Sequence, residues 1–217
     1  GREMERRRES SKRAQDLMTT PLMKAFDIKR EKEKVRNAYG GGFGKNCLLA
    51  RRLVEVGVPF VEVSLSGWDT HDNNFDRVKG LSGQLDRGFS ALLGDLADRN
   101  LLENTLVVIT SDHGEELFEH GGLDHGRTLY EEVLRVPLIV RWPDGEAPRG
   151  EAPRTLLDIA PTLLHHAGVA APEGWLGSNL RDEPSRASLR VAQLGSWGMA
   201  VRRGDLKLID LAGSPEA

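Results

Sequence analysis

Two apolar segments joined by a long amphipathic segment limit most strongly how this chain can fold. Residues 58–66 and 105–110 are rich in β-branched side chains, as strands are, and residues 77–99 repeat apolar side chains three and four positions apart, as an amphipathic helix does. A strand, a crossover helix and a second strand form a βαβ unit, in which the two strands are parallel. The pattern therefore predicts an α/β fold with a mainly parallel sheet flanked by helices.

Further segments extend this alternation. We expect helices over residues 45–56 and 155–167, a third strand over 137–142, and a C-terminal antiparallel hairpin of residues 199–203 and 206–211. The glycine between the last two segments supplies the turn. The elements after residue 100 therefore continue the α/β pattern and end in a small antiparallel subdomain.

Charge divides the chain unevenly. Residues 1–36 hold 12 Lys and Arg against 7 Asp and Glu, whereas the remainder holds 18 against 26. Runs of mixed charge are usually exposed faces of helices. We expect a charged N-terminal helical segment over 1–36, a partial α/β domain over 37–190, and the start of a hairpin subdomain over 191–217.

Composition excludes several classes of protein. The single cysteine cannot form an intramolecular disulfide, and no apolar run approaches the ~20 residues of a membrane-spanning helix. The net charge of −3 does not indicate a general nucleic-acid partner. No signal peptide is visible, and the chain opens on Gly1 without an initiator Met, so we expect it to be a fragment.

Two pairs of Asp and His follow predicted strands. Asp69 and His71 come after the first strand, and Asp112 and His113 come after the second. Either pair alone is more often a turn with a helix cap. Because the carboxyl ends of parallel strands share one edge, we expect the two pairs to meet there, and carboxylates with imidazoles are typical ligands of divalent cations.

A glycine-rich loop over residues 119–126 adds two histidines. His125 is the better candidate ligand, whereas for His120 a solvent-exposed position and a place in the site both stay open. His165 and His166, on the predicted helix over 155–167, are expected to pack or face solvent. A bound divalent cation neutralises the oxygens of a tetrahedral anion, and this chemistry suits sulfate and phosphate esters.

Several strings resemble a known family. Ser-Asp-His-Gly-Glu at 111–115, His-Gly-Arg-Thr-Leu-Tyr-Glu-Glu at 125–132 and Arg-Val-Pro-Leu-Ile-Val at 135–140 resemble the C-terminal half of sulfatases, within the alkaline phosphatase superfamily. The likeness covers about residues 100–211. Residues from about 20 to 105 are similar to an uncharacterised, sulfatase-like family of exported bacterial proteins.

The resemblance implies roles for particular residues. Asp112 and His113 match the position of metal ligands. His125 matches a position that contacts the ester group, so it is expected to contact the substrate or a second metal and is the catalytic candidate. Further metal or substrate contacts would come from Asp69 and His71, and substrate contacts from His120 and Arg127. The family suggests Ca²⁺, while the nitrogen ligands favour Zn²⁺ or Mn²⁺.

The same resemblance implies a sulfated or phosphorylated small molecule or glycan as substrate, and a periplasmic or extracellular location. The chain departs from sulfatases because it contains no Cys-x-Pro-Ser-Arg motif for the nucleophile and no N-terminal pair of Asp ligands; Cys47 does not match. Either the nucleophile lies upstream in a longer protein, or the chain joins two related families at a seam near residues 101–104.

Two functions therefore stay open. We expect a metal-dependent hydrolase of sulfate or phosphate esters, incomplete in this chain. The alternative is a noncatalytic, sulfatase-like binding or surface-associated protein that keeps the fold and the cation pocket.

Overall fold

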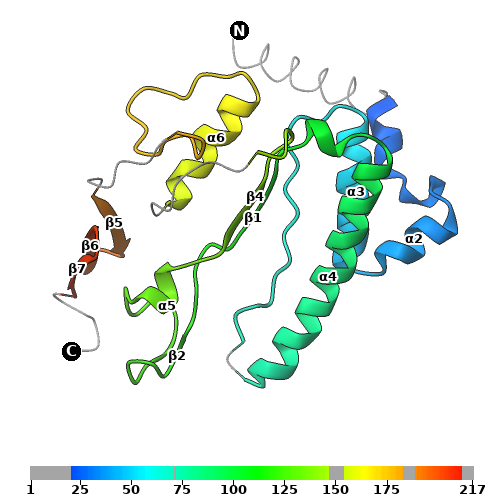
Figure 1. The fold of residues 1–217 in the computed structure, drawn as a ribbon. Helices are drawn as coiled ribbons and strands as arrows, with labels where there is room; N and C mark the ends of the chain where they lie inside the picture. Colours follow the sequence, from blue (N-terminus) through cyan, green and yellow to red (C-terminus); the bar gives the residue numbers. More distant parts are fainter. Residues whose placement is uncertain (1–20, 71, 147–153, 183–188, 212–217) are drawn as a thin grey trace, which may run out of the picture. The chain divides into compact units, whose positions relative to one another are not determined.

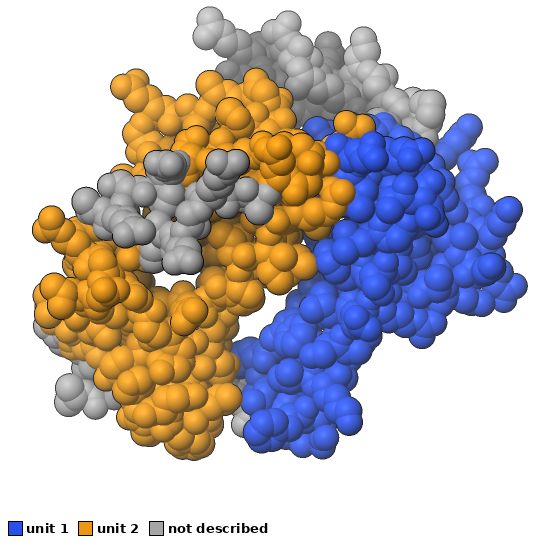
Figure 2. Space-filling model, viewed as in Figure 1, with its two compact units in different colours: residues 1–103 blue, residues 104–217 orange. Residues whose placement is uncertain are grey.

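The computed structural model describes residues 21–70, 72–146, 154–182 and 189–211. The chain divides into two compact units, residues 1–103 and 104–217, which are described separately below (Figures 1 and 2). The first part of the charged segment predicted over 1–36 lies outside the described residues. The three-part division at residues 36 and 190 remains a prediction.

Unit 1 is helical in its described part. Its elements are η1 (Pro21–Phe26), η2 (Ile28–Arg30), α2 (Glu33–Tyr39), α3 (Phe43–Glu55) and α4 (Asn74–Asp98), followed by η3 (Leu102–Asn104) at its boundary. Helices α3 and α4 confirm the helices predicted over 45–56 and 77–99. They pack against each other and against α2, because the apolar stripe of each must be buried.

The core of unit 1 lies where α2, α3 and α4 converge. Tyr39, Phe43, Cys47 and Leu48 are buried there, and side chains of α4 such as Phe89 pack around them. Cys47 is fully buried, and this burial raises the pKa of its thiol to about 11. Cys47 therefore packs as a small core residue, as its place on the predicted helix suggested.

Two glycines allow close backbone contacts, one between α4 and α3 and one between α3 and the end of α2. A Cβ atom on Gly88 would lie 3.0 Å from the Cα of Gly44, and one on Gly44 would lie 1.8 Å from the carbonyl oxygen of Tyr39. No side chain fits at either position without moving backbone.

The buried cation of Arg51 joins the polar faces of the same helices. Arg51 is 0% exposed, and its guanidinium forms ion pairs with Glu31 at 2.9 Å, Glu55 at 2.6 Å and Asp95 at 2.8 Å. Burial alone would raise the pKa of Glu31 and Asp95, but hydrogen bonds from arginines and the charge of Arg51 lower both. The network thus keeps both carboxyl groups ionised.

The prediction of a strand over residues 58–66 is wrong. The segment forms no strand, although Val63 and Leu65 pack on the core of unit 1 (Figure 1). A strand needs a neighbouring strand to receive its backbone hydrogen bonds. Among the described residues none pairs with this segment.

The described residues of unit 2 form three small sheets. The strands are β1 (Val107–Thr110), β2 (Glu116–Leu117), β3 (Leu123–Asp124), β4 (Leu138–Arg141), β5 (Arg190–Leu194), β6 (Gly198–Arg203) and β7 (Leu206–Asp210). The helices are α5 (Glu131–Leu134), η4 (Leu156–Asp158) and α6 (Ile159–His166). Strands β1 and β4, helix α6 and the β6–β7 hairpin confirm the elements predicted there, whereas β5 was not predicted.

The direction of the strands corrects the predicted sheet. Strand β1 pairs with β4 in antiparallel register, with Val107 opposite Arg141 and Thr110 opposite Leu138. The pairs β2–β3, β5–β6 and β6–β7 are antiparallel too, so no parallel pair occurs among the described residues. The parallel arrangement rested on pairing of β1 with residues 58–66, which form no strand.

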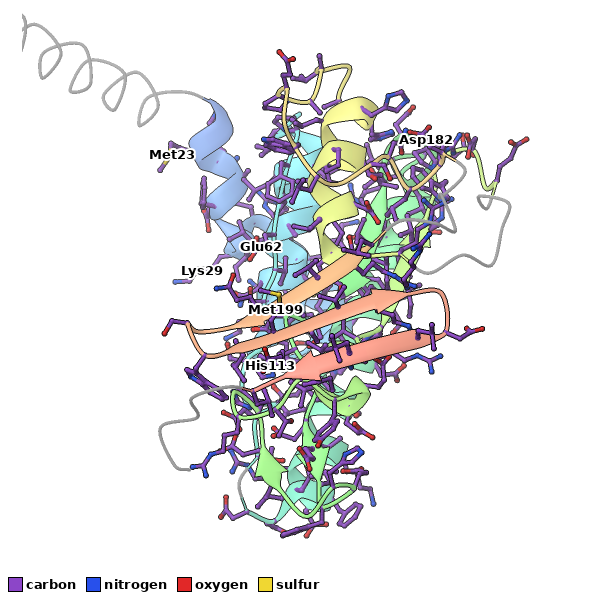
Figure 3. All side chains as sticks on the ribbon, turned by 90° about the vertical axis from the view of Figure 1, so that its left-hand side faces the viewer. Met23, Lys29, Glu62, His113, Asp182 and Met199 are labelled. Atoms are coloured by element: carbon purple, nitrogen blue, oxygen red, sulfur yellow. The ribbon has the colours of Figure 1, made fainter. Side chains whose placement is uncertain are left out.

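The C-terminal sheet is attached to α5 by charge. Both Arg202 on β6 and Lys207 on β7 contact the carboxylate of Glu131 at 2.8 Å. The hydrogen bond from Lys207 contributes most to lowering the pKa of Glu131. Figure 3 shows this sheet with Met199 labelled.

Among the described residues, no helix has both the length and the apolar surface needed to cross a bilayer.

We expect Gly44→Ala to destabilise unit 1, because its new Cβ atom would overlap the backbone of Tyr39. The expected loss in the free energy of unfolding is about 1–3 kcal/mol, the range for overpacked sites. Urea unfolding followed by circular dichroism measures it. Gly41→Ala is the matched control, since a Cβ atom there meets nothing within 4 Å. Equal stability of the two variants would contradict the close approach.

We expect unit 1 to lose stability in mild acid. Glu31 and Asp95 have lowered pKa values in the folded chain, so they stabilise it above their unfolded values, near pH 4, and this stability is lost as the pH falls through the folded values. Urea unfolding between about pH 6 and pH 3 measures the loss. Asp95→Asn should be less stable at neutral pH and less sensitive to acid; an unchanged pH dependence in this variant would contradict the role of the network.

Candidate functional site

The candidate site of unit 2 begins where β1 ends. The loop over residues 111–115 is packed tightly against α5, because the N–H of Gly114 donates to the carbonyl of Val133 at 2.8 Å. A Cβ atom on Gly114 would lie 1.9 Å from the carbonyl oxygen of Glu132, so only glycine allows this approach. The hydroxyl of Ser111 donates to the carbonyl of His113 at 2.7 Å. These contacts fix the backbone that carries Asp112 and His113.

Asp112 and His113 each offer one atom that could bind a metal ion. Nδ1 of His113 lies 2.9 Å from the carbonyl oxygen of Gly114, which can only accept, so in the neutral ring the proton is assigned to Nδ1 and the lone pair to Nε2. Nε2 in turn lies 3.8 Å from Oδ2 of Asp112. Histidines that bind metals usually donate their other ring N–H to a carbonyl or carboxylate in this way.

Local hydrogen bonds keep Asp112 ionised. Burial tends to raise its pKa, but the backbone N–H groups of Asp112 and His113 donate to the carboxylate and lower the pKa overall. The Asp112 side chain is 88% exposed and that of His113 is 37% exposed. The pair is therefore open to an ion from solvent.

A second cluster lies against His113. The rings of His113 and His125 stack, with centroids 3.8 Å apart and planes at 21°. Nδ1 of His125 lies 3.1 Å from Asp124 and 3.6 Å from Glu115, at ion-pair distances without hydrogen-bond alignment. Ligand atoms of Glu115, Asp124 and His125 lie within 4.8 Å of one another, so these three could also hold a cation.

The loop between β2 and β3 is organised around a buried carboxylate. Glu116 is 1% exposed, and it accepts hydrogen bonds from the backbone N–H groups of His120 and Gly122 and from the hydroxyl of Thr128. The ring of His120 stacks on Tyr130, with centroids 3.7 Å apart. The anchored loop begins and ends beside the residues of the second cluster.

The other predicted site residues are exposed or lie outside the described residues. His120 and Arg127 are exposed on the loop and on the turn after β3, and His165 and His166 are exposed at the end of α6. Asp69 is exposed in unit 1, after the extended segment, and His71 lies outside the described residues. The meeting of the two Asp and His pairs therefore stays a prediction.

Three carboxylates of this region had no predicted role: Glu115, Glu116 and Asp124. Glu115 and Glu116 follow the Asp-His pair after one glycine, and Asp124 directly precedes His125. In extended backbone, neighbouring side chains point to opposite sides. This alternation could have indicated from the sequence that one of Glu115 and Glu116 faces inward.

Two family profiles match the chain. Residues 118–188 match the profile described as N-sulphoglucosamine sulphohydrolase, C-terminal, so unit 2 contains a sulfatase-like C-terminal region of the alkaline phosphatase superfamily. Residues 1–130, more than half of the chain, match the profile described as a protein of unknown function (DUF1501). The chain belongs to this DUF1501 family.

Individual relatives agree with a sulfatase-like hydrolase family. The chain is 38% identical over 78 residues to the Escherichia coli (strain K12) protein named uncharacterized sulfatase YidJ, a match that covers 36% of this chain and 16% of the relative. It is 39% identical over 99 residues to an N-acetylglucosamine-6-O-sulfatase of Bacteroides thetaiotaomicron, covering 45% and 18% respectively. The chain thus spans less than a fifth of the length of these relatives.

A solved structure shares the fold. The phosphonate monoester hydrolase of Silicibacter pomeroyi superposes with a TM-score of 0.51 at 23% sequence identity, over 72% of this chain and 35% of that protein. At this identity the likeness shows the fold alone. The α/β prediction is thus supported at the level of fold.

We expect neutral His113 to be protonated on Nδ1, because the Gly114 carbonyl accepts a hydrogen bond there. Long-range proton–nitrogen correlation spectra of the uniformly labelled chain report the tautomer. The exposed His165 and His166 serve as internal references without such a constraint. Protonation of neutral His113 on Nε2 would remove the lone pair that a cation needs.

Proposed function

We propose that this chain supplies the cation-binding and ester-contacting part of a metal-dependent hydrolase of sulfate or phosphate esters. The observation that carries the proposal is the position of His113. Its Nδ1 atom is occupied by the Gly114 carbonyl, so the lone pair of Nε2 and the nearby Oδ2 of Asp112 are free to share one cation. The sulfatase-like relatives support the reaction class.

Asp112 and His113 would hold the cation in this proposal. Asp69 and His71 are proposed as further ligands, as the resemblance implies. The cation would be Ca²⁺ by family, or Mn²⁺ or Zn²⁺ by the nitrogen ligand. When bound, it would supply positive charge that neutralises the oxygens of the ester group.

His125 is the proposed contact to the ester group. Its ring stacks on His113, so a substrate held at the Asp112 and His113 pair would lie beside it. Its Nδ1 atom lies 3.1 Å from Asp124 and 3.6 Å from Glu115, so two carboxylates flank one side of the imidazole. A ring N–H of the imidazole can donate to an ester oxygen as charge develops there. His120 and Arg127 are proposed as outer contacts to the substrate.

A sulfated or phosphorylated small molecule or glycan is the proposed substrate class, because the relatives include a sulfatase named for an amino sugar. An exported location is proposed from the same family resemblance.

The second candidate is a cation-dependent binding protein without turnover. Binding needs only the cation held by Asp112 and His113 and no nucleophile, and the 217 residues contain no Cys-x-Pro-Ser-Arg motif. Both candidates require the cation site. Hydrolysis separates them, since only the enzyme releases product.

We expect Asp112→Asn to weaken Mn²⁺ binding by at least about 100-fold, more than the loss of a supporting group usually costs, because one anionic ligand is replaced by a neutral amide. Titration calorimetry with Mn²⁺ measures the affinity. Hydrolysis is followed in parallel as the release of 4-nitrophenol from 4-nitrophenyl sulfate and 4-nitrophenyl phosphate. Asp98→Asn, which removes the same charge from the exposed end of α4, is the control and should bind as the wild type does. Equal Mn²⁺ affinity of wild type and Asp112→Asn would overturn the assignment; binding without hydrolysis would favour the second candidate.

A further inference from the structure

We propose that Glu116 is a positioning residue whose buried carboxylate sets the geometry of His125 against His113. This inference rests on the proposed function, because positioning has a purpose only if the two histidines act on a common ligand. No part of that function assigns a role to Glu116 itself.

The carboxylate of Glu116 closes the loop that follows β2. Its Oε1 atom accepts the backbone N–H groups of His120 and Gly122, both at 3.2 Å, and its Oε2 atom accepts the hydroxyl of Thr128 at 2.9 Å. The donors lie four, six and twelve positions further along the chain. One side chain thus ties both ends of residues 117–128 together.

The fit around this carboxylate is close. Glu116 is 1% exposed, and a Cβ atom on Gly122 would lie 3.1 Å from its Oε1 atom. A buried carboxylate without donors would be strongly destabilising, so the loop cannot move away from Glu116 without leaving it unsatisfied. The loop conformation and the buried charge therefore depend on each other.

Backbone strain in the loop also indicates that its conformation depends on Glu116. Phe118 and Asp124 have φ angles of 71° and 95°, in a region that residues other than glycine rarely adopt. Such conformations cost on the order of 1–3 kcal/mol each and persist only where surrounding contacts enforce them. The hydrogen bonds to Glu116 lie beside both positions, since Gly122 is between them and Glu116 pairs with Asp124 across β2 and β3.

The anchor connects directly to the candidate site. Glu115 precedes Glu116 and points to the opposite side in extended backbone, where its Oε1 atom meets Nδ1 of His125 at 3.6 Å. Across the hairpin, Asp124 is the strand partner of Glu116 and the chain neighbour of His125. A shift of Glu116 would therefore displace both carboxylates that contact His125, and with them the ring that stacks on His113.

The test compares Glu116→Gln and Thr128→Val with Thr128→Ser and Glu146→Gln. Glu116→Gln replaces one accepting oxygen by an amide that donates, and Thr128→Val removes the hydroxyl at nearly constant volume. Thr128→Ser keeps the hydroxyl, and Glu146→Gln removes the same charge from an exposed turn. Unfolding curves establish that each variant is folded.

Two readouts are taken on the full chain. The first is the nuclear Overhauser contact between the imidazole protons of His113 and His125 in the metal-free chain, which a purely stabilising residue would leave intact in a folded variant. The second is the affinity for Mn²⁺ by calorimetry. We expect Glu116→Gln and Thr128→Val to lose the ring contact and to bind Mn²⁺ about 10-fold more weakly, as the loss of outer supports of metal sites does. Thr128→Ser and Glu146→Gln should match the wild type in both.

Each outcome is decisive. A folded Glu116→Gln chain with an intact ring contact and unchanged affinity overturns the proposal. If Glu116→Gln does not fold, Thr128→Val decides in the same way. If the wild type binds no Mn²⁺ but the ring contact still depends on Glu116 and Thr128, the positioning role stands and the proposed function fails.

Discussion

Unit 2 depends on buried carboxylates that accept hydrogen bonds from its own loops. Two of the three sheets in its described part have only two strands, so sheet ladders satisfy little of the backbone there. Glu116 provides acceptors for one loop, and Asp158, 8% exposed, accepts the N–H groups of Thr155 and Ser178 at the start of α6. Irregular backbone is thereby held in defined positions, which a loop must be if it is to present ligands to an ion.

In unit 1 the buried charge is positive, whereas in unit 2 it is negative. There the buried group is the Arg51 cation, surrounded by carboxylates from η2 to α4, and Arg52 adds a further contact to Glu31. Helices satisfy their own backbone, so side chains can be used between them. Removing one partner from such a network leaves an uncompensated charge, whereas replacing the whole network costs far less. The network therefore favours one mutual arrangement of the helices rather than adding much stability.

The sequence predicts the elements of this protein better than their pairing. Helical periodicity identified α3 and α4, and Gly204 identified the β6–β7 hairpin, because these signals are local. The parallel sheet was wrong because strand pairing is decided by distant partners, and residues 58–66 have none among the described strands. In the site, Asp112 and His113 could be proposed from their place after a strand. The roles of Glu115 and Glu116 could not, since only the folded loop decides which carboxylate turns inward.

The single cysteine gives this chain a built-in reporter of motion. Cys47 lies beneath α4 with no exposed surface, and its raised pKa keeps it as the unreactive thiol at neutral pH. An alkylating reagent can therefore reach it only during moments when the helices separate. The labelling rate in native buffer, divided by that of the unfolded chain, would report the population of the open state when reclosing is fast, without a probe having to be engineered into the protein.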